Sequence, residues 1–175
     1  MSHSDPGAAA HSLAEDAFGT LLFILARGFA LAGGVVLLAL TLMSVASVAS
    51  RSLGLKPVPG DFELVQLGCA VAVSLFLPWC QMRGGHVIVD FFTLHLARGK
   101  RATLDALGAL ALALCAALLT WRLALGLVSA QQSEESTMIL GVPVWWAFVP
   151  MVPAFALLTL TGLHSAWAYF REVLR

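Results

Sequence analysis

The stretch that decides the fold is residues 60–90, which read GDFELVQLGCAVAVSLFLPWCQMRGGHVIVD. It opens with two acidic residues, Asp61 and Glu63, continues as a long apolar run and ends in a Gly-Gly-His turn. The apolar part, residues 62–82, has about 21 residues, and a helix of that length crosses the roughly 30 Å hydrocarbon core of a bilayer. Its few charges stand at its ends. We therefore predict a transmembrane helix over residues 62–82.

The composition of the whole chain supports a membrane protein. The 175 residues are 59% hydrophobic and only 11% charged, with a mean hydropathy of +0.88. A soluble domain carries about 25% charged residues, so the excess apolar surface of this chain must face lipid. The formal net charge of zero argues against a nucleic-acid partner. Three cysteines lie inside apolar runs without a C-x-x-C spacing and are expected to be small buried hydrophobic residues: Cys69, Cys80 and Cys115.

Three further apolar runs, residues 21–49, 102–129 and 142–169, are also long enough to span a bilayer. The predicted fold is an all-α integral membrane protein, with a single four-helix domain over residues 21–175 and an N-terminal cytoplasmic tail over residues 1–20. For the first run, a secretory signal peptide is the competing interpretation, because Val-Ala-Ser-Val-Ala-Ser resembles a cleavage site. The run far exceeds the 7–15 residues of a signal-peptide core, which favours a retained helix.

Residues 86–101 differ from both a span and a plain loop. On a helical wheel, His86, Asp90 and Thr93 fall on one narrow polar stripe, while Phe91 and Phe92 belong to the apolar remainder. A helix of this kind with a basic end suits a membrane surface or the groove of a partner. We therefore predict an amphipathic interfacial helix over residues 86–101.

The basic residues predict the orientation. The 83–101 segment and the C-terminal end are rich in Arg and Lys, whereas the polar loop 130–141 has none and contains Glu134 and Glu135. The positive-inside rule places both termini and the amphipathic segment in the cytoplasm and loop 130–141 outside.

Several side chains are candidates for structural roles. Asp61 is expected to be the N-cap of the helix over residues 62–82, and Glu63 to interact favourably with its dipole. Arg122 lies inside a span, about 10 Å below the level of Glu63 by helix rise, so the two are a hypothetical ion pair. The alternative is that Arg122 reaches lipid phosphates. Ala109, Ala113 and Ala117, four residues apart, predict a small face for helix contact.

The sequence gives no sign of catalysis. Zinc-protease, Walker, nucleophile-elbow and dinucleotide motifs are missing from it, so we expect neither an enzyme nor a cofactor or metal site. A cytochrome-type four-helix anchor is the alternative class, with His86, His95 or His164 as haem ligands. Two axial histidine ligands must lie at the same depth in the membrane, and the predicted depths of His86 and His164 differ. His164 is expected instead to be a hydrogen-bonded packing residue.

Taken in order, these features resemble the small membrane subunit (Q subunit, DctQ-like) of tripartite ATP-independent periplasmic (TRAP) transporters. A Gly60, Asp61 and Glu63 entry is followed by a span and an Arg-Gly-Gly-His-x-x-Val-Asp exit. The residues of that exit are Arg83, Gly84, Gly85, His86, Val89 and Asp90. Residues 50–61 resemble the first loop of that family, and residues 135–145 are similar to its entry into the last helix. The resemblance extends from about residue 40 to the C-terminus.

The resemblance implies a function. In such transporters a periplasmic substrate-binding protein delivers an organic acid anion to a large membrane subunit, which carries the substrate and sodium sites and moves as an elevator. The small subunit widens the fixed scaffold and does not bind substrate. The expected function is thus a non-catalytic permease subunit in the bacterial inner membrane, with the large subunit, the binding protein and lipids as partners. The alternative is a membrane anchor or assembly subunit of another complex.

Overall fold

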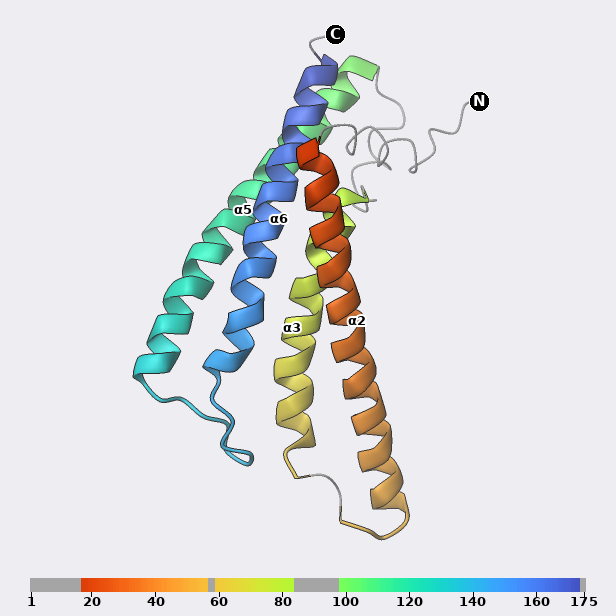
Figure 1. Ribbon diagram of the computed structural model, residues 1–175, viewed down its shortest axis with the longest axis vertical. Helices are drawn as coiled ribbons and strands as arrows, with labels where there is room; N and C mark the ends of the chain where they lie inside the picture. The colour runs from red at the N-terminus through yellow and green to blue at the C-terminus, as the bar shows by residue number, and fades with distance from the viewer. Residues whose placement is uncertain (1–16, 57–58, 84–97, 174–175) are drawn as a thin grey trace.

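The computed structural model describes residues 17–56, 59–83 and 98–173. These residues form four α-helices: α2 (Ala17–Ser52), α3 (Asp61–Met82), α5 (Arg98–Gln132) and α6 (Trp145–Val173) (Figure 1). Each contains a segment that is long and apolar enough to cross a membrane. The predicted all-helical fold with four transmembrane helices is therefore confirmed.

At most of their ends the helices extend beyond the predicted spans, because the apolar runs continue into polar ends with good helix formers. Helix α2 begins at Ala17 rather than at residue 21, and α6 continues to Val173. The start of α6 is an exception, since it begins at Trp145 rather than at residue 142, and residues 142–144 belong to a hairpin loop. Helix α5 begins at Arg98, so residues 98–101 form its first turn, whereas the sequence assigned them to the amphipathic segment. The rest of that predicted segment, residues 86–97, lies outside the described residues.

The four helices pack as two pairs, which are joined mainly by α3 against α6 and also by a smaller contact of α2 with α6. Helix α2 packs along α3, α5 packs along α6, and α3 packs against α6 (Figure 1). The start of α2 and the end of α6 lie at one end of the bundle, which we call the terminal end. Loops 53–60 and 133–144 lie at the opposite end, which we call the loop end. In Figure 1 the two pairs diverge toward the loop end.

The apolar core lies nearer the terminal end. Leu22 and Ala26 of α2, Met82 of α3 and Leu157 of α6 form a buried cluster. Three aromatic side chains pack around it: Phe23, Phe29 and Trp79. Since side chains from three helices meet here, this cluster links the two helix pairs.

Small residues set the closest helix approaches. A Cβ atom placed on Gly162 of α6 would lie 3.0 Å from the Cβ of Ala113 on α5. Ala109 and Ala113 are buried, which confirms this part of the predicted small-residue face. Between α2 and α3, a Cβ on Gly33 would lie 3.1 Å from the backbone oxygen of Ala72. Such contacts let helices pack closely in a membrane, where apolar side chains gain little by leaving lipid.

Large apolar side chains cover the outside of the bundle, as a lipid-facing surface requires. Leu31, Val35 and Leu38 of α2 are all more than half exposed, as are Leu107 and Leu114 of α5.

Two predictions need correction, one about the burial of the cysteines and one about the hydrogen bonding of His164. Cys80 and Cys115 are exposed and Cys69 is half-buried, because an apolar residue in a membrane helix can face lipid as readily as the core. Nδ1 of His164 is buried without a hydrogen-bond partner among the described residues, so the expected hydrogen bond is not made by this atom. The imidazole lies instead 6.0 Å from the ring of Phe18.

Candidate functional site

At the loop end of the bundle, the first residues of α3 contact the last turns of α2. Helix α3 begins at Asp61, and its N-cap is Gly60, which has a left-handed conformation (φ 72°, ψ 17°) and provides no side-chain cap. The prediction that Asp61 is the N-cap is therefore wrong. A residue without a Cβ atom adopts this conformation freely, and it moves the helix start to Asp61 itself.

The carboxylate of Asp61 connects α3 to the end of α2. Its Oδ2 accepts a hydrogen bond from Oγ of Ser47 at 2.6 Å and one from Nη2 of Arg51 at 3.3 Å. Its Oδ1 accepts the N–H of Phe62 at 2.8 Å. Ser47 is buried, whereas the Arg51 side chain is 63% exposed. Because water screens an exposed ion pair, the hydrogen bond from Ser47 is the more protected of the two links.

Glu63 connects α3 to the other loop. Its Oε1 accepts the backbone N–H of Ile139 at 3.0 Å, and its Oε2 accepts that of Leu140 at 3.2 Å. Both partners belong to loop 133–144, between α5 and α6. An ionised carboxylate accepts hydrogen bonds more strongly than a neutral oxygen does, so one side chain on α3 holds two consecutive residues of this loop.

Loop 133–144 is a small hairpin that presents these two N–H groups. Ser136 and Pro143 form an antiparallel bridge, and the N–H of Val144 donates to the oxygen of Glu135 at 3.0 Å. Nearer the tip, the N–H of Thr137 donates to Val142 at 3.0 Å, and that of Gly141 donates back to Thr137 at 3.1 Å. The backbone N–H groups of Ile139 and Leu140, at the tip, donate to Glu63 rather than to acceptors inside the hairpin.

A close apolar contact adds to these hydrogen bonds. A Cβ atom on Gly60 would overlap with Cγ of Leu140 and lie 2.7 Å from its Cδ1. Glycine is thus favoured at position 60 both by the positive φ and by the close approach of the Leu140 side chain. We call the whole arrangement the loop clasp, which consists of these residues: Ser47, Arg51, Gly60, Asp61, Glu63, Ile139 and Leu140.

The hypothetical ion pair between Glu63 and Arg122 is wrong. Both carboxylate oxygens of Glu63 face loop 133–144, and the ion pair found among the described residues joins Arg51 to Asp61. Arg122 is exposed on α5, which packs along α6. The prediction used helix rise, which gives only the depth of each residue in the membrane. Whether two side chains at similar depth face each other depends on which helices are neighbours and on how each helix is rotated.

The remaining predicted site residues lie outside the described part of the chain: Gly84, Gly85, His86, Asp90, Phe91 and Phe92. Conversely, the sequence did not point to Ser47, Ile139 or Leu140. One signal was present, because three consecutive apolar residues lie at the tip of this loop: Met138, Ile139 and Leu140. A run of apolar residues in a loop is a departure from the usual polar pattern, and Leu140 is the one of the three that is half-buried, against α3.

The loop end also exposes apolar side chains. Met138 is fully exposed, and Phe62 and Leu53 are each 76% exposed. The described residues contain no group of three or more His, Cys, Asp or Glu side chains placed to hold a metal ion. The arrangement as a whole braces two loops and offers surfaces for contact with lipid or protein.

Comparison with known proteins identifies the family. Residues 40–172 match the family of tripartite ATP-independent periplasmic transporters, DctQ component. No curated protein and no solved structure gives a significant match to the chain. The family match begins within α2 and includes α3, α5, α6 and the loop clasp. Since it covers well over half of the sequence, this chain belongs to the DctQ family, the small permease component of TRAP transporters.

Proposed function

We propose that the chain is the non-catalytic small subunit of a TRAP-type secondary transporter and forms part of a fixed scaffold around a large elevator-type subunit. That partner would import an organic acid anion, a carboxylate, together with sodium. The observation that carries the proposal is the family match over residues 40–172 on a chain with four membrane-length helices.

The character of the described helices supports a scaffold role. Charged side chains are sparse within the spans, so the chain has little with which to coordinate an anion or Na⁺. The sodium and substrate sites are accordingly assigned to the large subunit. The close contacts at Gly33 and Gly162 and the loop clasp hold the helices against one another, and a scaffold needs such fixed contacts.

The proposed location is the bacterial inner membrane, with both termini in the cytoplasm and loop 133–144 on the periplasmic side. Two observations support this orientation. Basic residues are concentrated in residues 83–101 and at the C-terminus. The start of α2 and the end of α6 lie at the same end of the bundle (Figure 1). The periplasmic substrate-binding protein would then approach the loop end.

We also propose that the 86–101 segment anchors the subunit at the cytoplasmic interface or against the large subunit. Replacing Phe91 and Phe92 by Asp tests this role, because each lost aromatic burial is worth roughly 1.5–3 kcal/mol. The double variant should assemble poorly, while Glu134→Gln in the loop at the opposite end should assemble normally. Normal assembly of the Asp variant would remove the anchoring role.

Co-purification and transport test the main proposal. The chain is tagged and co-expressed with the large multi-span protein and the binding protein encoded beside it, and an unrelated four-span protein serves as the control. The complex should co-purify with the large protein and, in proteoliposomes, take up an organic acid anion only with the binding protein and an inward sodium gradient. A complex with some other enzyme, or a haem Soret band in the purified protein, would favour the anchor alternative.

A further inference from the structure

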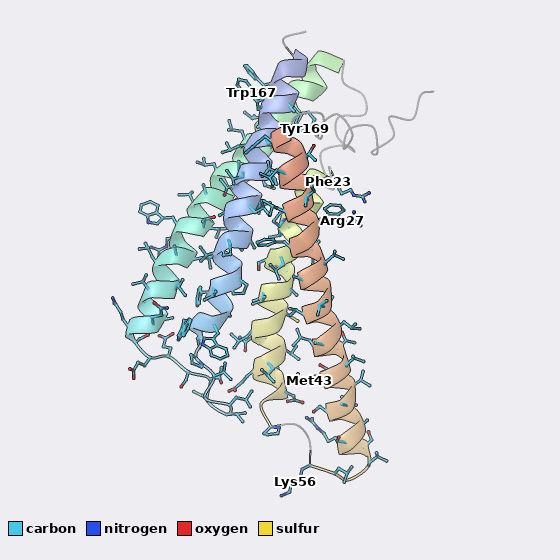
Figure 2. The ribbon with its side chains drawn as sticks, viewed as in Figure 1. Phe23, Arg27, Met43, Lys56, Trp167 and Tyr169 are labelled. Atoms are coloured by element: carbon cyan, nitrogen blue, oxygen red, sulfur yellow. The ribbon has the colours of Figure 1, made fainter. Side chains whose placement is uncertain are left out.

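Two arginines flank an aromatic pair where α2 and α3 meet near the terminal end. The rings of Phe23 on α2 and Trp79 on α3 lie 4.8 Å apart at 51°. The guanidinium carbon of Arg83, one turn beyond Trp79, lies 4.9 Å from the centre of the Trp79 ring. Arg27 stands one turn from Phe23, and Figure 2 shows the two on the same side of α2.

The antiparallel packing of α2 and α3 directs both arginine side chains toward this aromatic pair. Side chains on a helix tilt toward its own N-terminus. On α2 this tilt carries Arg27 toward the level of Phe23, and on α3 it carries Arg83 back toward Trp79. The second of these directions is observed in the contact of Arg83 with Trp79. The Arg83 guanidinium thus lies over Trp79, and the tilt of the Arg27 side chain is expected to bring its charge toward the level of the same ring pair.

Within their own helices these arginines are far from any acid. Helix α2 contains no Asp or Glu, and the only acids of α3 are Asp61 and Glu63 in its first turn. Glu63 and Arg83 are 20 positions apart, which is about 30 Å of helix. Among the described residues, the ion pair is that of Arg51 with Asp61, at the loop end. Both Arg27 and Arg83 are exposed, so a ligand can reach them from outside the bundle.

The depth of this cluster is that of a membrane interface. Arg83 follows the last residue of α3, about one hydrocarbon thickness from Glu63. Tryptophan is enriched at this level, and arginine extends from within a span toward the phosphate layer. Arg27 lies roughly 6 Å deeper than Phe23 by helix rise, and its tilt brings its charge back toward that layer.

We propose that Arg27, Arg83 and the Phe23–Trp79 pair bind the phosphate headgroup of an anionic phospholipid. Two guanidinium groups offer planar sets of donors that match phosphate oxygens. The aromatic pair supplies apolar surface for the glycerol and the first acyl carbons. Basic pockets between transmembrane helices bind lipid headgroups in this way. A phospholipid bound here would add a lipid ligand to the proposed scaffold function.

Native mass spectrometry of the purified full chain tests the proposal. Phosphatidylglycerol and phosphatidylcholine are titrated onto the wild type, Arg27→Gln, Arg83→Gln, the double variant, and Lys56→Gln as a control for loss of an exposed basic residue at the loop end. Each lost charge near the surface should weaken phosphatidylglycerol binding about fivefold, and the loss of both about 25-fold. Lys56→Gln should bind as the wild type does, and Arg27→Lys with Arg83→Lys should keep most of the binding.

The competing occupants give different results. Equal binding of the two lipids, or equal phosphatidylglycerol binding in the wild type and the double variant, would overturn the site. Displacement of the lipid by millimolar inorganic phosphate would mean that the site takes free phosphate, and would overturn the lipid assignment. Thermal unfolding in phosphatidylcholine nanodiscs shows whether the double variant is folded. If it is not, phosphatidylglycerol binding is compared between the wild type, the two single Gln variants and the double Lys variant instead.

Discussion

The carboxylate of Glu63, in the first turn of α3, accepts the backbone N–H of Leu140, which lies 77 residues further along the chain. This bond and its neighbour at Ile139 tie the α5–α6 connection to the α2–α3 pair at the loop end. The buried apolar cluster links the same pairs nearer the terminal end. The bundle is therefore fastened at two separated levels, by polar contacts at one end and by apolar packing toward the other.

Removing the carboxylate of Glu63 should release the tip of loop 133–144. In Glu63→Gln one side-chain oxygen remains an acceptor, but the new amide NH₂ faces a backbone N–H, and Glu63→Ala removes both acceptors. We expect faster amide hydrogen exchange at Ile139 and Leu140, more so in Glu63→Ala. Exchange in the middle of α6 should be unchanged. Glu134→Gln, in the same loop, is the control.

Hydrogen-exchange mass spectrometry on peptides covering residues 133–144 measures this effect. The clasp would be refuted by equal exchange of that peptide in the wild type and Glu63→Ala.

Gly60 should be intolerant of substitution for two separable reasons. Gly54 and Gly60 both have φ near +72°, but a Cβ atom at Gly54 meets nothing within 4 Å, whereas at Gly60 it overlaps with Leu140. A side chain in the left-handed region costs roughly 1–2 kcal/mol. Gly54→Ala should cost about that much, and Gly60→Ala clearly more.

The additional destabilisation caused by Gly60→Ala should depend on the side chain of Leu140. In a Leu140→Ala background the cost of Gly60→Ala should fall to that of Gly54→Ala, because the overlapping atoms are gone. Equilibrium unfolding in detergent gives the free energies of unfolding of the wild type, Gly54→Ala, Gly60→Ala, Leu140→Ala and the Gly60→Ala, Leu140→Ala double variant. Equal costs for the two glycines in the wild-type background would show that the Leu140 contact is absent.

Much of the fold could be predicted from the sequence, because each span is an apolar run of bilayer length and such runs need no partner to be recognised. The pairing of helices could not be predicted in the same way. The small face of Ala109 and Ala113 was visible, but nothing in the sequence showed that Gly162 would meet it. Glu63 lies in the first turn of α3, as predicted, but the N-cap role of Asp61 and the partner of Glu63 were misassigned, because Gly60 is the N-cap and because loop 133–144 reaches α3. Contacts between distant loops depend on helix neighbours, which span length does not reveal.

The contact between α5 and α6 should be sensitive to side-chain size at Gly162. A Cβ atom there lies 3.0 Å from Cβ and 3.2 Å from Cα of Ala113, and a backbone atom cannot rotate away. Gly162→Leu should therefore destabilise the protein by about 1–3 kcal/mol, as overpacking does. Gly108→Leu on α5 is the control, since a Cβ atom there meets nothing within 4 Å. The contact would be disproved if thermal unfolding in detergent gave the same stability for both variants.

The proposed orientation can be tested with single cysteines after Cys69, Cys80 and Cys115 are replaced by Ser. Gln132 is exposed at the end of α5, on the side proposed to face the periplasm. A cysteine at Gln132 should react with an impermeant maleimide in intact spheroplasts, and one at Thr93 should react only after the membrane is permeabilised. The reverse pattern would place the termini outside.

Substitutions at Glu63 and Arg122 should be additive. Glu63 is engaged by loop 133–144, and Arg122 is exposed on α5, about 15 Å of helix from the end of α5 at Gln132. Residues without shared contacts change stability independently, whereas an ion pair gives a coupling free energy in a double-mutant cycle. We expect the effect of Glu63→Gln with Arg122→Gln on the free energy of unfolding to equal the sum of the single effects within experimental error. Ser47→Ala with Asp61→Asn is the positive control, because Oγ of the buried Ser47 donates a hydrogen bond of 2.6 Å to Asp61. A coupling between Glu63 and Arg122 as large as that of the control pair would bring the two side chains together after all, and would require α5 to turn toward α3.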